Sequence, residues 1–161
     1  MAVAPDPVLT LTSLISGAYN TANVDSRSAT IQDPTLRNVD DSKDIDIIKI
    51  YNVSSETPPV GIFNRDENIT DVLSIDIQTT YGSENNRDLT VTGREHIVKV
   101  KQEIERIIAA NRSDPTSLPS GSQTYATLRK VSNEDFSDEQ RFSWRYLITV
   151  EIKIFWRSIL P

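Results

Sequence analysis

Residues 142–156 read FSWRYLITVEIKIFW, and every even-numbered position in this stretch is apolar. The odd-numbered positions are mostly polar, with Leu147 and Phe155 as the exceptions. A period of two held for about sixteen residues predicts one long β-strand with an apolar face and a mostly solvated face. Most strands have about five or six residues. A strand this long is therefore expected to bend at a bulge or to extend toward a partner.

Helix signals occur at two places before this strand. The pair Asp6-Pro7 predicts the start of a short helix to about residue 17, because Asp is a good N-cap and Pro suits the first helical position. Thr92 and Glu95 form a capping box, and apolar residues follow it at helical spacing. The main helix is therefore predicted to begin there and to end near Asn111.

Three further strands are predicted at residues 45–53, 69–81 and 125–131, where β-branched and aromatic residues gather. Residues 18–44 are expected to form a long loop or arm, with one short strand near residues 29–31. The expected fold class is α+β: a small, mostly antiparallel four-stranded sheet, two helices packed on one face, and a long C-terminal strand. Residues 1–161 are expected to form a single domain, with a C-terminal tail at residues 158–161.

Composition excludes several classes of function. The formal net charge of -6 and the pI near 4.8 argue against a dedicated DNA or RNA binder, which needs clustered Lys and Arg. The chain has no cysteine, which excludes disulfides, zinc-thiolate sites and thiol nucleophiles. Neither a signal peptide nor an apolar stretch of about 20 residues is expected. The predicted compartment is the cytoplasm, or a particle assembled there.

Isolated polar residues give weak signals for chemistry. His96, the single histidine, has no nucleophile or second histidine at catalytic spacing, so a surface or helix-terminal role is favoured. Two acidic groups are interpreted as solvated surface, although the first could offer oxygen ligands to a divalent cation. The groups are Asp40, Asp41, Asp44 and Asp46 before a strand, and Glu134, Asp135, Asp138 and Glu139 in a turn.

The sharpest enzymatic alternative is a metal-dependent nuclease. Glu151 and Lys153 form a Glu-x-Lys motif on a strand, and Asp76 on another strand could complete a magnesium site. Any strand with one solvated face produces such a triplet, and the acidic pI also argues against a nuclease. No catalytic residue, metal ligand or cofactor site is therefore predicted.

Exposed apolar residues are the stronger candidates for function. They could fold back over the core, or they could form a protein interface, where aromatic anchors are common. The candidate interface residues are Val60, Ile62, Phe63, Leu147, Phe155, Trp156, Ile159 and Leu160.

The order of elements resembles the tail terminator, or tail completion, proteins of long-tailed phages and tailed archaeal viruses. The resemblance covers most of the chain, from the helix at residues 7–17 and the strand at residues 45–53 onward. It continues through LSIDIQT (73–79), REH (94–96), AANR (109–112) and RYLITV (145–150). The long segment 18–44 and the unusually long last strand depart from the family pattern.

The resemblance implies a structural virion protein of the head–tail neck and no enzymatic activity. Such a protein forms a homo-oligomeric ring, usually of six subunits, that caps the tail tube and joins it to the head connector. Its implied partners are further copies of itself, the tail tube protein and a head connector or neck protein, with no specific nucleic acid sequence and no membrane. The implied location is the virion, after assembly in the host cytoplasm. Head-closure and neck adaptor proteins, which are similar in size, remain alternatives, as does a monomeric adaptor module.

Overall fold

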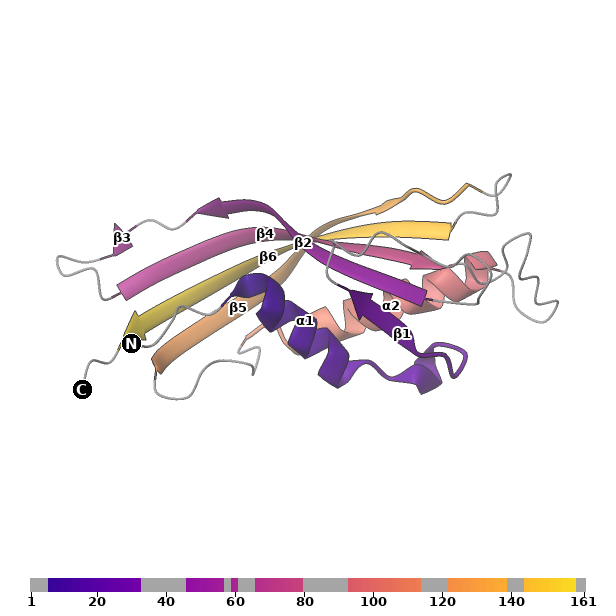
Figure 1. Ribbon diagram of the computed structural model, residues 1–161, viewed down its shortest axis with the longest axis horizontal. Helices are drawn as coiled ribbons and strands as arrows, with labels where there is room; N and C mark the ends of the chain where they lie inside the picture. Colours follow the sequence, from indigo (N-terminus) through magenta and orange to yellow (C-terminus); the bar gives the residue numbers. More distant parts are fainter. Residues whose placement is uncertain are drawn as a thin grey trace.

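A computed structural model describes residues 6–32, 46–56, 59–60, 66–79, 93–113, 122–138 and 144–158 (Figure 1). Two α-helices lie in these ranges, α1 (Pro7–Ala18) and α2 (Gly93–Ala110), together with the short 3₁₀ helix η1 (Thr21–Asn23). The strands there are β1 (Ala29–Gln32), β2 (Asp46–Glu56), β3 (Pro59–Val60), β4 (Asp66–Thr79), β5 (Ser122–Asp135) and β6 (Trp144–Ser158). The structure is therefore α+β, as the sequence predicts.

The sheet is mixed, with the order β1-β2-β4-β6-β5 and the short β3 paired with β4 beside this path. The predicted four-stranded, mostly antiparallel sheet differs in this detail, because the short strand expected near residues 29–31 is β1, which joins the sheet parallel to β2 and places Ala29 opposite Asp46. The physical reason is a set of contacts from α2, described below, that hold the segment before β1 alongside β2. The four strands predicted from the sequence correspond to β2, β4, β5 and β6, whose mutual pairings are all antiparallel.

The helices begin where local chemistry favours them. The Asp6 carboxylate accepts hydrogen bonds from the amides of Val8 and Leu9, at 2.8 and 3.2 Å, which confirms the predicted N-cap of α1. The predicted layer of two helices differs in its arrangement. Helix α2 packs against β4, β5 and β6, whereas α1 contacts β2 and α2.

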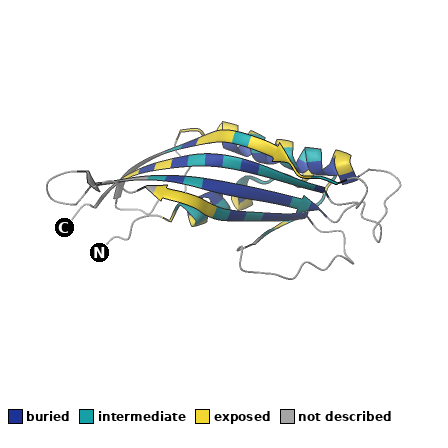
Figure 2. Cartoon of the chain, turned by 90° about the horizontal axis from the view of Figure 1, so that it is seen from above, coloured by how far each residue is buried: buried dark blue, intermediate teal, exposed yellow. Residues whose placement is uncertain are grey.

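The core alternates along the strands as a period of two requires. Ile148, Val150, Ile152 and Ile154 of β6 are all fully buried and face the helices together with Leu73, Ile75 and Ile77 of β4. Fully burying one such side chain is worth about 1.5–3 kcal/mol. Figure 2 shows this pattern as buried positions that recur along the central strands. The helical part of the same core is Leu11, Leu14, Ile15, Ile97, Val100, Ile104, Ile107 and Ile108.

The long C-terminal strand lies inside the sheet. Strand β6 runs without a register shift along β4 and pairs with β5 on its other side. The register shifts of the sheet lie in other strands, β2 and β5. One register shift lies between Asn52 and Ser54 of β2, and the other lies between Lys130 and Ser132 of β5. Each shift leaves one exposed valine between its two residues, Val53 or Val131.

One end of the sheet extends past both helices. Figure 1 shows β3 and the adjoining ends of β4, β6 and β5 running beyond α1 and α2. We call this part the extended end; Phe155, which pairs with Asn68 and Tyr125, follows the fully buried Ile154 in the part of β6 that leads to it. Among the described residues, no helix is both long and apolar enough to cross a membrane.

Candidate functional site

A cluster of polar contacts lies between α2 and the segment that joins α1 to β1. Four side chains of α2 contribute to it: His96, Lys99, Glu103 and Arg106. Spacings of three and four residues place these side chains on one face of the helix. We call this set, with the groups that it binds, the polar seam.

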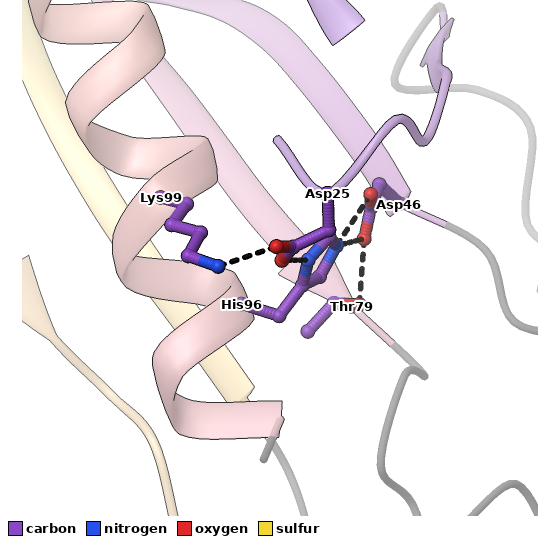
Figure 3. A network of polar contacts seen from close by, with 5 residues as sticks. All are labelled: Asp25, Asp46, Thr79, His96 and Lys99. Atoms are coloured by element: carbon purple, nitrogen blue, oxygen red, sulfur yellow. Dashed lines mark hydrogen bonds and ion pairs between the residues drawn. The ribbon is translucent and has the colours of Figure 1, made fainter. Parts of the chain in front are cut away.

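The first half of the polar seam surrounds a buried histidine (Figure 3). His96 is fully buried, and its Nδ1 lies 2.8 Å from a carboxylate oxygen of Asp25. Its Nε2 lies 2.7 and 2.8 Å from the two carboxylate oxygens of Asp46. The Thr79 hydroxyl donates to Asp46 at 2.6 Å, and the Lys99 ammonium contacts Asp25. The predicted surface position of His96 is therefore wrong, whereas its predicted position near a helix terminus is correct, because α2 begins at Gly93.

The two carboxylates set the charge of this histidine. Burial alone lowers the pKa of His96, but the hydrogen bonds to Asp46 and Asp25 outweigh it and raise the pKa above its usual value. For Asp25, burial raises the pKa, and the hydrogen bonds from His96 and Lys99 outweigh it, so the pKa is lowered. Each ring nitrogen lies within hydrogen-bond distance of a carboxylate oxygen, so the geometry favours the imidazolium, which can donate from both nitrogens.

Both ring nitrogens of His96 are engaged in this arrangement. An imidazolium with both N–H groups engaged has no lone pair to accept a proton or to bind a metal. Within the described ranges, no group of three or more His, Asp or Glu residues is arranged to hold a metal ion. What the geometry does supply is a charged connection between α2, the turn at Asp25 and the first residue of β2.

The second half of the polar seam is built on Glu103, which is 2 % exposed. Its carboxylate accepts from the Asn20 amide at 2.9 Å and from the Asn23 side chain at 2.7 Å. It also accepts two hydrogen bonds from Arg106, at 2.9 and 2.6 Å. The hydrogen bond from Arg106 is the largest cause that lowers the pKa of Glu103 to about 2. Arg106 also donates to the carbonyl of Ala18 at 3.0 Å, so it holds the end of α1.

Sequence signals for these residues existed. Asp46 alternates with Ile48 and Ile50, so a period of two places it on the core face of its strand. His96 and Glu103 flank the apolar stripe of α2 at helical spacing. The interpretation of Asp46 as part of a solvated strand entry is wrong, because this residue is 2 % exposed and accepts hydrogen bonds from Thr79 and His96. Asp40, Asp41 and Asp44 lie outside the described residues.

The predicted interface residues fall into three groups. Phe155 is exposed at 38 %, and Leu147 is half-buried on the same face of β6, opposite Asp76 and Glu134. Val60 and Trp156 lie in β3 and β6, where their side chains are outside the described part of the chain. Ile62, Phe63, Ile159 and Leu160 lie outside the described residues altogether.

The residues of the nuclease alternative share a face of the sheet but do not converge. Asp76 pairs with Leu147 in the β4–β6 ladder, so Glu151 lies four residues further along β6. At roughly 3.3 Å per residue, the separation along the strand is about 13 Å, too far for both carboxylates to bind one metal ion. Asp76 instead accepts two hydrogen bonds from Arg145, both at 2.8 Å, and Glu151 lies 3.3 Å from Arg129.

Comparison with known proteins gives no assignment. No protein-family model matches this chain, and no curated protein matches it.

Proposed function

We propose that the chain is a structural subunit of a viral head–tail neck, most specifically a tail terminator that acts by ring assembly. In this role it caps the tail tube, stops its polymerisation and connects it to the head. The proposal starts from the order of elements that resembles that family. The elements that carry the resemblance follow one another along the chain as α1, β2, β4, α2, β5 and β6.

The observation that carries the proposal is the extended end of the sheet. Strands β4, β5 and β6 have 14, 14 and 15 residues, and part of this length runs beyond both helices (Figure 1). A sheet that served only to cover the helices would not need this length. A cyclic ring requires each subunit to present two different surfaces that meet across every contact. The extended end, with the exposed Phe155 in the part of β6 that leads to it, offers one such surface.

The polar seam supports a scaffolding role in the same protein. It uses buried charge to fix the segment between α1 and β1, and its histidine has no free acceptor for chemistry. A ring subunit must keep its two contact surfaces at a constant angle, since small angular errors prevent a ring from closing. Ionic contacts that tie α2 to both α1 and β1 contribute to such rigidity.

Mass measurement combined with negative-stain imaging tests the proposal. The purified chain, alone or with a tail tube protein, should form closed rings of about six copies. Phe155→Asp should abolish the rings, because it places a charge in the proposed contact. Leu9→Asp is the matched control, since Leu9 is also exposed, at 64 %, but lies on α1. A strictly monomeric mass in the presence of tail tube protein would refute ring assembly.

The partner distinguishes the tail terminator from a head-closure or neck adaptor protein. A tail terminator should bind the end of a preformed tail tube and limit its length in a polymerisation assay. Head-closure and adaptor proteins should bind the head connector without affecting tube length. No observation in the described residues favours the nuclease alternative.

A further inference from the structure

Among the described strands, β5 lies at one edge of the sheet and pairs only with β6. Its inner side pairs with β6 along its whole length. Its outer side meets the residues that follow α2, through the bridge between Ser113 and Thr127 and a 3.0 Å hydrogen bond from the Leu128 amide to the Arg112 carbonyl. Within the described residues, no strand pairs with the outer side of residues 129–134. A long open edge of this kind is a template for pairing with another chain.

The bulge at Val131 determines which backbone groups point outward. Leu128 donates outward to Arg112, so by alternation Lys130 also points its amide and carbonyl outward. Phe136 donates inward to the Arg145 carbonyl at 2.9 Å, so Glu134 points inward and Asn133 points outward. The outward positions 130 and 133 are thus three residues apart, because the register shift adds one residue between them.

The side chains on the two sides of the bulge can be assigned to the two faces of the sheet. Lys130 and Asn133 both donate to Glu105 of α2, at 2.8 and 3.0 Å, so both lie on the helix side of the sheet. Arg129 lies 3.3 Å from Glu151 on the opposite, open face. Glu134 follows Asn133 and therefore lies on the open face as well. Residues 129–134 thus have a cation and an anion at their two ends, on the same face.

We propose that this edge pairs with the same edge of a second copy. In an antiparallel pair centred between Val131 and Ser132, Lys130 of each copy lies opposite Asn133 of the other. These two outward-pointing pairs can form four backbone hydrogen bonds. Arg129 then lies directly opposite Glu134 of the second copy, and the two-fold axis repeats this ion pair. The two sheets become one continuous sheet.

Charge and register both select a second copy as the occupant. Arg129 is 71 % exposed and remains available to a carboxylate from outside in addition to Glu151. A shift of one residue in the pairing would place outward groups opposite inward groups and would bring side chains of opposite faces together. In the register centred between Val131 and Ser132, Arg129 of each copy lies opposite Glu134 of the other. Pairs of opposite charge that lie directly opposite each other stabilise antiparallel strands.

Self-pairing at this edge does not depend on the proposed neck function. The contact is isologous, so it joins two copies and no more, whereas a ring closes through unlike surfaces. In free subunits it gives a dimer, and in rings it joins two rings face to face. In either case its loss halves the particle mass and leaves the ring contact at the extended end untouched.

Charge reversal across the edge provides a direct test. Arg129→Glu places Glu opposite Glu134 twice, and Glu134→Arg places Arg opposite Arg129 twice. Each variant should weaken self-pairing about tenfold or more and halve the mass seen by light scattering and sedimentation. An equimolar mixture of the two variants should restore the original mass, because every cross-copy pair is again of opposite charge. Gln102→Glu, at an exposed position of α2, should leave the mass unchanged.

The mixture also excludes misfolding as an explanation, since two misfolded variants would not restore pairing. Self-pairing is overturned if both charge-reversal variants keep the mass of the wild type. It is also overturned if each variant alone has half that mass and the equimolar mixture does not regain it. If the two reversals act as stated but rings never form, self-pairing stands and the neck function fails. If rings form and neither reversal changes their mass, the neck function stands and self-pairing fails.

Discussion

Glu103→Gln should remove about 3 kcal/mol from the free energy of unfolding at pH 7. The pKa of Glu103 is about 2, against an ordinary value of 4.5, and each pKa unit corresponds to about 1.4 kcal/mol. Glutamine keeps the shape of the side chain, but its amide nitrogen must face a donor from Asn20, Asn23 or Arg106. A buried donor that faces another donor is unsatisfied, which adds to the loss of charge.

The loss should depend on pH with a definite sign. The pKa of Glu103 is lower in the folded than in the unfolded chain, so its contribution is fully present above pH 4.5 and is lost as the pH falls toward 2. Urea unfolding of wild type and variant at pH 7 and pH 3 measures this difference. The difference in free energy of unfolding between wild type and Glu103→Gln should be smaller at pH 3 than at pH 7 by roughly 2 of the 3 kcal/mol, which is more than half.

Glu105→Gln is the matched control on the same helix. The Glu105 side chain is 23 % exposed and pairs with Lys130, so its replacement should cost about 1 kcal/mol or less. Hydrogen exchange gives an independent readout, because the Asn20 amide donates to Glu103 and should lose protection only in Glu103→Gln. A stabilising charge at Glu103 is refuted if Glu103→Gln stays within about 0.5 kcal/mol of wild type at pH 7, or if its deficit is equal at both pH values.

Two further predictions concern the other half of the polar seam and the core. The stability gap between wild type and His96→Ala should be widest below pH 6.5 and should narrow as the pH rises through the raised pKa of His96, where the imidazolium is lost. The NMR titration of this sole histidine should have its midpoint above 6.5, and a midpoint at or below that value would contradict the ion pairs. Ile104→Ala should cost about 2–5 kcal/mol in urea unfolding, because it leaves a cavity at a fully buried position. Gln102→Ala, at an exposed position of the same helix, should be nearly neutral, and equal losses in the two variants would argue against this core.

Local chemistry in the sequence determined the elements and their faces. Helix α1 begins at Pro7 because the Asp6 carboxylate accepts hydrogen bonds from free amides of the first turn and Pro7 has a helical φ angle. Both effects depend only on residues that are adjacent in the sequence. The alternation in residues 142–156 predicts β6 and its core face because successive side chains of a strand point to opposite sides. A period of two does not state how many neighbours a strand has, so the central position of β6 could not be predicted.

Tertiary structure alone decided the partners of the polar side chains. His96 lies 71 residues from Asp25 and 50 from Asp46, and no local pattern relates three positions so far apart. Their meeting depends on how α2 packs over the sheet and on the parallel pairing of β1 with β2. The bulge at Val131 has the same origin, since a register shift is a relation between two strands. Sequence determines which side chains a helix or strand buries, because burial follows local periodicity. The packing of helices and strands determines which charged side chains meet in the interior, because an ion pair requires contact between distant parts of the chain.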